Sequence, residues 1–425
     1  MKPLLFISCP LETMSGYGAR SRDIVRAILK HDKYDVKVLS QRWGNTAYNA
    51  LDLNNPDDKI LYDLIWKEQH LPKQPDIWIQ ITVPNEFQPV GKFNIGITAG
   101  IETTICDPSW IEGLNKMNLN LVSSNHAKKT FEESAFEKKD PKTNQILGVV
   151  KLEKPVEVLF EGADLNKYFA IPDTELEETD LVLSLDEINE KFCFLFVGHW
   201  LQGQIGEDRK NVGYMIKAFL ETFKNKKVKP ELILKTSSAN NSILDRDEVL
   251  KKIDAIKNTV KGDLPNIYLL HGDLDDKDMN DLYNHDKVKT MISFTKGEGF
   301  GRPLLEFSLV KKPIIASNWS GHLDFLSPEF NTLVGGGLTN VHPSAAVKNM
   351  ILEEAQWFTP TDASVADALE NNFKDYNKYA ELAKRQTHYA KTNFSFDKMA
   401  EALDVILDRV PRQVEIKLPK LKKLS

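Results

Sequence analysis

The feature that most restricts the fold of this chain is a glycine-rich turn between two short apolar runs, within residues 290–317. The first run covers residues 290–294, the turn reads Gly297-Glu298-Gly299-Phe300-Gly301, and the second run covers residues 312–317. A helix-like stretch, residues 303–310, separates the turn from the second run. This order of strand, turn, helix and strand is typical of a parallel α/β sheet. Such a turn points backbone N–H groups and the positive end of a helix at an anion.

Length and composition indicate a two-domain globular protein without a membrane span. The chain has 425 residues, of which 41% are hydrophobic and 27% are charged, and a net charge of -6 that gives no overall attraction for nucleic acid or anionic lipid. No stretch approaches 18 consecutive apolar residues, and the apolar run at the N-terminus is too short for a signal peptide. The three cysteines (Cys9, Cys106 and Cys193) lack metal-binding spacing, which favours a reducing compartment, so we expect a cytoplasmic protein.

The first 172 residues alternate between strand and helix patterns. After a buried strand (3–9) comes the turn Ser15-Gly16-Tyr17-Gly18, then apolar residues at helical spacing over 19–30. Further strands are expected at 36–39, 77–81, 94–98, 119–123 and 156–160, and a helix at 125–133. Residues 137–154 are rich in lysine and are expected to form a surface hairpin or loop. We interpret residues 1–172 as one Rossmann-like domain.

A second alternating set follows an acidic stretch at 173–190, which we interpret as a connector between domains. Its expected strands are 192–197, 231–235 and 266–270, and its expected helices are 212–223, 244–260 and 275–284. Residues 344–407 are expected to be mostly helical. The predicted architecture is α/β, with two Rossmann-like doubly wound domains facing each other across a cleft. The second domain would cover 191–395, and 396–425 would form a helix crossing back to the first domain and a basic tail (417–423).

The glutamates Glu298 and Glu306 stand eight positions apart on the two sides of the turn. If Glu306 lies in the helix, the two carboxylates are roughly 10 Å apart, since a helix rises about 1.5 Å per residue. Retaining glycosidases need about 5 Å and inverting ones up to about 9.5 Å between carboxylates. Two separate contacts on one elongated ligand that carries phosphate and hydroxyls, such as a nucleotide sugar, suit this spacing better. The alternative is a glycine-capped helix with solvated acids.

Four stretches of the chain, in order, are similar to motifs of one enzyme family. They are residues 15–18 (SGYG), 159–164 (LFEGAD) followed by Tyr168-Phe169, 196–200 (FVGHW) with 208–212 (DRKNV), and 297–306 (GEGFGRPLLE). The last resembles the Glu-x7-Glu signature of retaining glycosyltransferases of family 4, also called glycosyl transferases group 1. The resemblance implies the GT-B fold of two Rossmann-like domains, in which the first (1–172) binds the acceptor and the second (191–395) binds the nucleotide sugar. It also implies transfer of a sugar from a nucleotide-diphosphate sugar, with UDP or GDP as the nucleotide, to a hydroxyl acceptor with retention of configuration.

The resemblance also assigns roles to residues. It implies that Lys210, with Arg209 beside it, neutralises the donor diphosphate, and that Glu298 lies near the transferred sugar. Glu306 would hold the ribose. Backbone N–H groups of the glycine turn (Gly299, Phe300, Gly301) would face the donor, and Gly16 and Gly18, with Tyr17 between them, would let the first domain close over the phosphates. Fixed cations lower the barrier because negative charge builds on the leaving oxygen. The scheme requires no metal, because Lys210 and helix N-termini supply the positive charge.

The sequence departs from the family pattern at two places. His199 follows Gly198, where the family usually has a phosphate-binding arginine, so the diphosphate contact is expected to fall on Arg209 and Lys210. The first domain lacks the family's histidine in residues 95–104, and Thr98 or Glu102 would stand in for it. The sequence alone does not choose between these two.

Other candidates carry weaker signals. His271 and Lys235 end expected strands and would contact the nucleotide base and phosphate, respectively. The pair Asp273 and Asp275 matches the spacing of a metal-binding Asp-x-Asp, but helix N-capping is the better interpretation because a helix follows. His126 opens an expected helix and is expected at the surface.

Alternative functions stay open. An enzyme with the same fold could glycosylate a hydroxylated DNA base or a protein. The DNA alternative is supported by a basic face expected on the first domain, formed by Lys128, Lys129, Lys138, Lys139, Lys142, Lys151 and Lys154. An epimerase, a phosphorylase with a pyridoxal lysine, or a non-catalytic nucleotide-binding protein would use the same scaffold. For the main interpretation the acceptor would be a glycan, a glycolipid or a small molecule.

Overall fold

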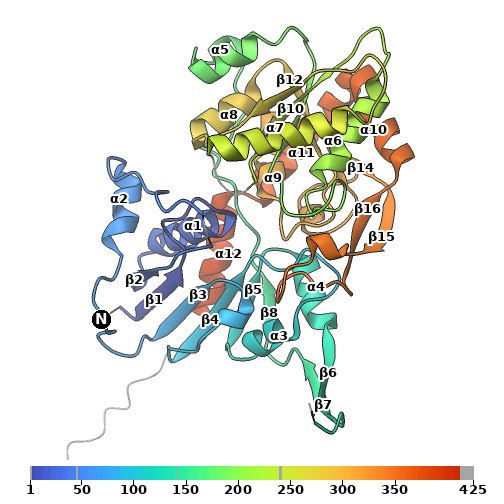
Figure 1. Cartoon of the computed structure of the whole chain (residues 1–425). Helices are drawn as coiled ribbons and strands as arrows, with labels where there is room; N and C mark the ends of the chain where they lie inside the picture. Colours follow the sequence, from blue (N-terminus) through green and yellow to red (C-terminus); the bar gives the residue numbers. More distant parts are fainter. Residues whose placement is uncertain (1, 45, 141, 239–241, 412–425) are drawn as a thin grey trace, which may run out of the picture.

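The computed structural model describes residues 2–44, 46–140, 142–238 and 242–411. It consists of two α/β halves, each built on a six-stranded parallel sheet, as Figure 1 shows. This confirms the predicted pair of Rossmann-like domains. The predicted boundary at residues 172/173 stays a prediction, and the predicted basic tail (417–423) lies outside the described residues.

The sheet of the N-terminal half has the spatial order β2-β1-β3-β4-β5-β8. Its strands are β1 (Leu4–Cys9), β2 (Asp35–Ser40), β3 (Ile77–Ile81), β4 (Phe93–Thr98), β5 (Leu119–Val122) and β8 (Val156–Val158). Every residue of β1 is buried, because the central strand of a parallel sheet is covered by other elements on both faces. The helices and turns of this half are α1 (Gly16–Lys30), α2 (Pro56–Asp63), η1 (Pro84–Glu86), α3 (Pro108–Leu114) and α4 (Asn125–Glu133).

Helix α1 begins three residues earlier than expected, so the predicted glycine turn is its first turn. Ser15 is the N-cap, and its side chain accepts a hydrogen bond from the backbone N–H of Gly18. A Cβ atom at Gly18 would lie 2.1 Å from the carbonyl oxygen of Thr13, so only glycine fits there. Nothing lies within 4 Å of a Cβ atom built on Gly16. The prediction of a loop at these glycines was therefore wrong, because the capping serine starts the helix before them.

The sheet of the C-terminal half has the order β11-β10-β9-β12-β13-β14. Its strands are β9 (Cys193–Val197), β10 (Glu231–Lys235), β11 (Ile267–Leu270), β12 (Val288–Ser293), β13 (Ile314–Ser317) and β14 (Thr332–Val334). Between them run α6 (Val212–Phe223), α7 (Ile243–Lys257), α8 (Asp276–Asn284), α9 (Arg302–Phe307), η3 (Ser308–Val310) and η4 (Gly321–Asp324). Asp275 caps α8 by accepting from the N–H of Asp278, as expected for this Asp-x-Asp pair.

The C-terminal third contains a two-stranded antiparallel sheet that the sequence did not predict. Its strands are β15 (Gly336–Asn340) and β16 (Gln356–Pro360), with η5 (Pro343–Ala345) between them. Thr104 of the N-terminal half and Gln356 exchange hydrogen bonds at 2.9 Å, so this small sheet touches both halves. The expectation of a mostly helical segment holds only from α10 (Asp362–Lys374) through α11 (Tyr376–Asn393) to α12 (Phe396–Asp408).

The chain crosses between the halves twice, and the two crossings lie side by side. Ala163 pairs with Ser395, and a Cβ atom at Gly162 would lie 2.6 Å from the Cα atom of Phe396. After the second crossing, α12 packs on α1 (Figure 1), which confirms the predicted return of the last helix to the first domain. The acidic stretch after the first crossing contains η2 (Asp173–Glu175) and α5 (Asp180–Asp186), and α5 packs against α8.

A β-hairpin projects from the N-terminal half (Figure 1). It consists of β6 (Ala135–Lys139) and β7 (Ile146–Lys151), which agrees with the surface hairpin or loop expected at 137–154. Among the described residues, no helix has the length and apolar character that crossing a lipid bilayer requires.

Candidate functional site

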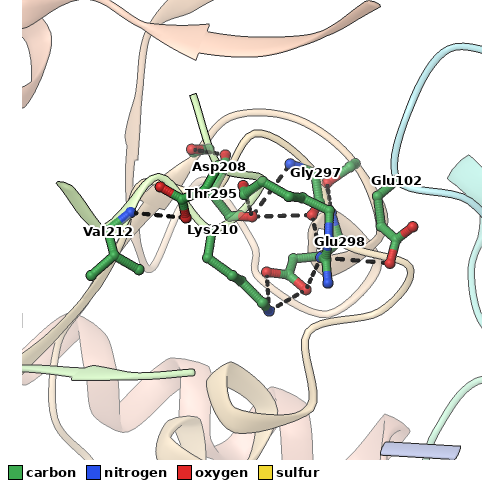
Figure 2. A network of polar contacts seen from close by, with 10 residues as sticks. Glu102, Asp208, Lys210, Val212, Thr295, Gly297 and Glu298 are labelled. Carbon is green, nitrogen blue, oxygen red and sulfur yellow. Dashed lines mark hydrogen bonds and ion pairs between the residues drawn. The ribbon is translucent and has the colours of Figure 1, made fainter. Parts of the chain in front are cut away.

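A charged network joins the loop before α6 to the glycine turn before α9 (Figure 2). The Nζ atom of Lys210 donates to both carboxylate oxygens of Glu298, at 2.6 and 2.8 Å. The guanidinium of Arg209 lies 3.4 Å from Glu298 and donates to the carbonyl oxygen of Gly297 at 2.9 Å. The structure thus brings together the three residues for which a catalytic role was predicted. They lie at the carboxyl ends of the neighbouring strands β9 and β12, the edge of a parallel sheet where ligands bind.

Local bonds hold this network in place. Asn211 has a left-handed backbone (φ 57°) and its side chain donates to the carbonyl oxygen of Phe294 at 3.0 Å. The hydroxyl of Thr295 donates to the carbonyl oxygens of Arg209 and Gly297. The N–H of Glu298 donates to the hydroxyl of Ser320 at 2.9 Å. These bonds fix the loop before α6 against the turn after β12, so Lys210 and Glu298 are held together by the backbone as well as by their charges.

Burial and charge shift the pKa values of these groups in different directions. Burial alone would raise the pKa of Glu298, but Lys210 and Arg209 outweigh burial and lower this pKa to about 2. Burial lowers the pKa of Lys210, partly offset by Glu298. Burial also disfavours the charged form of Arg209, but Glu102 and Glu298 together raise its pKa. At neutral pH Arg209 is therefore a cation and Glu298 an anion, and Lys210 is hydrogen-bonded to both oxygens of that carboxylate.

The N-terminal half contributes to this network through Glu102. Its carboxylate lies 3.5 Å from the guanidinium of Arg209. The backbones of the two halves also meet here, since a Cβ atom at Gly297 would lie 1.9 Å from the carbonyl oxygen of Glu102 and one at Gly299 would lie 2.5 Å from that of Ala99. Of the two candidates left open for the first domain, Glu102 is the one that contacts the charged network directly.

A second charged group surrounds Glu306. Arg302, four positions earlier on α9, donates from its Nε atom to Glu306 at 2.8 Å and from its Nη1 atom to Asp23 of α1 at 2.5 Å. The hydroxyl of Tyr283 lies 3.5 Å from the other carboxylate oxygen of Glu306. Burial raises the pKa of Glu306 to about 7, although Arg302 opposes this shift. Sequence reasoning missed Arg302 and Asp23, and the only local signal was a charge one helical turn before Glu306.

A third group lies at the ends of β9, β10 and β11. The Nζ atom of Lys235 donates to the carbonyl oxygen of Gly272 at 2.5 Å, and the Nε2 atom of His271 lies 2.8 Å from a carboxylate oxygen of Asp245. The Nδ1 atom of His199 lies 3.3 Å from the hydroxyl of Ser237. Burial lowers the pKa of His199, and the positive charges of Lys210 and Lys235 lower it further. His199 therefore lies within electrostatic reach of both lysines and is neutral at physiological pH.

The remaining predicted residues either tie α1 to the first sheet or lie at the strand and helix ends of the C-terminal half. Tyr17 and Thr98 share a hydrogen bond of 2.8 Å, and the N–H of Ala99 donates to Tyr17, so helix α1 is tied to the end of β4. Phe300 is buried in the core of the C-terminal half, with its ring centroid 4.9 Å from that of Phe325, so its side chain does not face a ligand. Gly198 is the first residue after β9, and its N–H donates to the carbonyl oxygen of Lys235. Gly301 has a φ of 97°, which favours glycine, and caps α9.

One expectation near the site was wrong. His126 is not a freely exposed surface residue, since its ring lies against that of Trp319 from the C-terminal half, with 4.6 Å between the centroids. Its Nε2 atom is buried without a hydrogen-bond partner among the described residues, and burial lowers its pKa to about 4. The sequence pattern correctly placed His126 in the first turn of α4. It could not show that Trp319 of the other half covers the ring, because that contact forms only when the two halves meet.

Solved structures with the same fold are numerous. A glycosyltransferase from Rickettsia africae superposes with a TM-score of 0.63 at 14% identity, over 96% of this chain and 98% of that chain. Sucrose-phosphate synthase from Thermosynechococcus elongatus gives 0.62 at 11%, over 96% and 99%. HepE from Anabaena, solved in complex with UDP-glucose, gives 0.60 at 12%, over 96% and 99%.

The chain has the GT-B fold. This agrees with the resemblance noted in the sequence, and the similarity extends over both halves in each comparison. No protein-family model and no curated protein sequence matches the chain. At 11–14% identity the superpositions establish the fold, and the activity has to be argued from the site. Among the described residues, no group of three or more His, Cys, Asp or Glu side chains is arranged to hold a metal ion.

Proposed function

We propose that this protein is a retaining glycosyltransferase that uses a nucleotide-diphosphate sugar as donor and a hydroxyl group as acceptor. The observation that carries the proposal is the convergence of Lys210 and Arg209 on Glu298 at the carboxyl end of the second sheet. Two buried cations fixed beside a glycine turn suit a diphosphate leaving group, and HepE, which has the same fold, was solved with UDP-glucose.

In the proposed reaction, the bond between the anomeric carbon and the diphosphate oxygen breaks, and its electron pair stays on the diphosphate. Lys210 and Arg209 stabilise this developing charge. The acceptor oxygen attacks the anomeric carbon from the same face, and its proton passes to the departing phosphate oxygen. Glu298 orients the two cations and lies beside the sugar hydroxyls, while Glu306 accepts hydrogen bonds from the ribose.

Further donor contacts are assigned to the other residues of the second sheet. His199 and Lys235 would contact the phosphates, and His271, held by Asp245, would lie at the base. The backbone N–H groups of Gly299, Phe300 and Gly301 and the strand end at Gly198 complete the donor side. Tyr17 and Thr98 with Glu102 form the acceptor side, next to the first turn of α1.

The proposal requires the two halves to separate during the reaction cycle. Gly297 and Gly299 lie against the backbones of Glu102 and Ala99, and Lys210 is occupied by Glu298. A donor therefore enters while the halves are apart. Its diphosphate then replaces the carboxylate of Glu298 as the partner of Lys210. Closure over the bound donor then excludes water from the reacting centre.

The test is the release of nucleotide from a panel of UDP- and GDP-sugars, with and without simple hydroxyl acceptors. We expect one sugar nucleotide to be consumed, and Lys210→Ala to lower the rate by about a hundredfold or more, as loss of one fixed donor does in such sites. Lys217→Ala, on the exposed face of α6, is the matched control and should keep full activity. Proton NMR of the product anomer tests retention. No turnover of any donor, or an unaffected Lys210→Ala variant, would refute the proposal.

A further inference from the structure

A fully buried histidine beside the charged network has one ring nitrogen without a partner. His322 lies in η4, and its Nε2 atom is 2.7 Å from the carbonyl oxygen of Ser317. A carbonyl oxygen only accepts, so Nε2 carries the proton and donates this bond. In a neutral imidazole the other nitrogen is an acceptor, and within the described part of the chain nothing donates to Nδ1 of His322. Buried polar atoms are rarely left unpaired, which points to a partner from outside the chain.

The histidine stays neutral, so Nδ1 keeps its lone pair. Burial lowers the pKa of His322, and the bond to Ser317 and the charge of Glu298 offset this only in part. Lys210 lowers the pKa further. At physiological pH His322 therefore has one donor, used within the fold, and one free acceptor. Glu298, whose pKa is about 2, is an acceptor as well.

The side chains of His322 and Glu298 lie beside the same glycine. A Cβ atom at Gly301 would lie 3.1 Å from the Cβ atom of His322 and 3.7 Å from the Cγ atom of Glu298. The N–H of Gly321 donates to the carbonyl oxygen of Glu298 at 2.9 Å, which fixes η4 against the glycine turn. The Nδ1 atom is two covalent bonds from the Cβ atom of His322. The free acceptor and the carboxylate therefore belong to one site, where we place the transferred sugar.

The backbone before His322 is strained in a way that is common at active sites. Ser320 has φ 83° and ψ -162°, a region that is almost restricted to glycine. Its hydroxyl accepts from the N–H of Glu298 at 2.9 Å, so this backbone holds the carboxylate and the histidine in one geometry. At the next position only glycine fits, since a Cβ atom at Gly321 would lie 2.1 Å from the carbonyl oxygen of Gly299.

The first half of the molecule covers η4. The backbone N–H and the side chain of Asn125, the first residue of α4, donate to Asp324 at 2.8 and 3.1 Å. The next residue is His126, which packs against Trp319 of the second half. If the halves separate, as the proposed reaction requires, η4 loses this cover before the donor enters.

We propose that His322 is a specificity-determining residue of the donor site: its Nδ1 atom accepts a hydrogen bond from one hydroxyl of the transferred sugar, beside the hydroxyl that Glu298 contacts. This inference rests on the proposed function and narrows its donor. Two acceptors side by side match two neighbouring hydroxyl groups, each of which donates one proton. The favoured class is a sugar nucleotide with a vicinal pair of free hydroxyls, because a sugar that lacks either one leaves a buried acceptor unpaired.

The first measurement uses the parent chain and the sugar nucleotide that it consumes fastest. Analogues of this donor that lack one sugar hydroxyl at a time are compared by kcat/KM. We expect two neighbouring positions at which loss of the hydroxyl lowers kcat/KM by about tenfold or more. One position belongs to Glu298 and the other to His322.

Two substitutions separate the roles of the two ring nitrogens. The amide of glutamine reaches the place of Nε2, so His322→Gln keeps a donor for Ser317 and removes the acceptor at Nδ1. The amide of asparagine reaches the place of Nδ1, so His322→Asn keeps that acceptor and loses the bond to Ser317. We expect His322→Gln to melt near the parent temperature and to lose discrimination against one deoxy analogue, with kcat/KM for the full donor about tenfold lower. We expect His322→Asn to melt lower and to keep the discrimination.

Two controls show whether the effect is confined to the sugar. Free UDP or GDP has no transferred sugar, so calorimetry should give the same affinity for the parent chain and for His322→Gln. His388→Gln, the same change at an exposed position of α11, should alter neither turnover nor discrimination.

The outcomes separate this inference from the proposed function. No turnover of any sugar nucleotide by the parent chain refutes both. Turnover without discrimination among the deoxy analogues overturns the inference alone, as does a His322→Gln variant that discriminates like the parent or that loses affinity for the free nucleotide. If His322→Gln does not fold, His322→Asn decides: retained discrimination supports the inference, and lost discrimination overturns it. Loss in His322→Gln together with retention in His322→Asn supports it.

Discussion

Arg302 on α9 joins the two halves of the molecule through an ion pair with Asp23 on α1, and the same guanidinium holds Glu306. One cation thus serves two buried carboxylates, one from each half. Glu306 is the residue to which we assign the ribose contact. Arg302 therefore contacts both a proposed donor-binding residue and the opposite half of the molecule.

This arrangement predicts that replacing Arg302 lowers the free energy of unfolding more than replacing Asp23 does. Arg302→Met removes the ion-pair partner that the buried carboxylates of Asp23 and Glu306 share, and should lower the free energy of unfolding at pH 8 by about 3–5 kcal/mol. At pH 5 the loss should be smaller, because the buried carboxyl of Glu306, whose pKa is raised to about 7, can take up a proton. Asp23→Asn leaves Arg302 paired with Glu306, so it should lower the free energy of unfolding by less than Arg302→Met does. Urea unfolding measures all three proteins, with Arg246→Met, a surface ion-pair residue, as the control. Equal losses for Arg302→Met and Asp23→Asn would contradict this account.

The Lys210–Glu298 contact predicts that replacing Glu298 lowers the rate of turnover without weakening the binding of the nucleotide. If the diphosphate replaces Glu298 as the partner of Lys210, then Glu298→Gln frees the lysine and should not weaken binding of UDP or GDP. The same change removes the carboxylate that orients both cations, so nucleotide release from the donor should fall by about a hundredfold or more. Isothermal titration calorimetry gives the affinity and a nucleotide-release assay gives the rate. A parallel loss of affinity and rate would instead mean that Glu298 binds the donor itself.

The buried carboxyl of Glu306 predicts a pH dependence of stability. Its pKa is raised from 4.5 to about 7 in the folded protein, so between these values the folded state binds more protons than the unfolded state. The stabilisation from the neutral carboxyl is complete below pH 4.5 and is lost as the pH rises to about 7, at up to about 1.4 kcal/mol per pH unit. Glu306→Gln cannot titrate, so the difference in unfolding free energy between it and the parent should change over this window. A constant difference from pH 4.5 to 8 would exclude the raised pKa.

The contact at Gly297 predicts that one methyl group will hold the halves apart. A Cβ atom there would lie 1.9 Å from the carbonyl oxygen of Glu102, so Gly297→Ala cannot keep the observed closure. We expect a larger radius of gyration in small-angle X-ray scattering and a strong loss of turnover, with each half still folded. Gly337→Ala is the matched control, because nothing lies within 4 Å of a Cβ atom at that position. An unchanged radius for Gly297→Ala would mean that closure does not depend on this contact.

Much of the fold followed from local patterns. The two sets of buried strands, the helical spacing over 212–223 and the strand ends at Lys235 and Leu270 were readable because their periodicity depends only on neighbouring residues. The small sheet of β15 and β16 was not predicted, since β15 is exposed throughout and includes two glycines, which gives no alternation of apolar and polar residues. The start of α1 was misplaced because the capping action of Ser15 was overlooked.

The sequence by itself determined the two parallel α/β halves, the glycine turn that carries Glu298 and the presence of Lys210 and Arg209 before a helix. These features are encoded over stretches of about twenty residues, where spacing alone sets the geometry. Only the tertiary structure decided that Lys210 lies against Glu298, that Arg302 bridges Asp23 and Glu306, that Glu102 contacts Arg209 and that Trp319 covers His126. Apart from the pair of Arg302 and Glu306 within α9, each of these contacts joins residues far apart in the chain, most of them across the two halves. No local pattern specifies which surfaces of two separately folded sheets will meet.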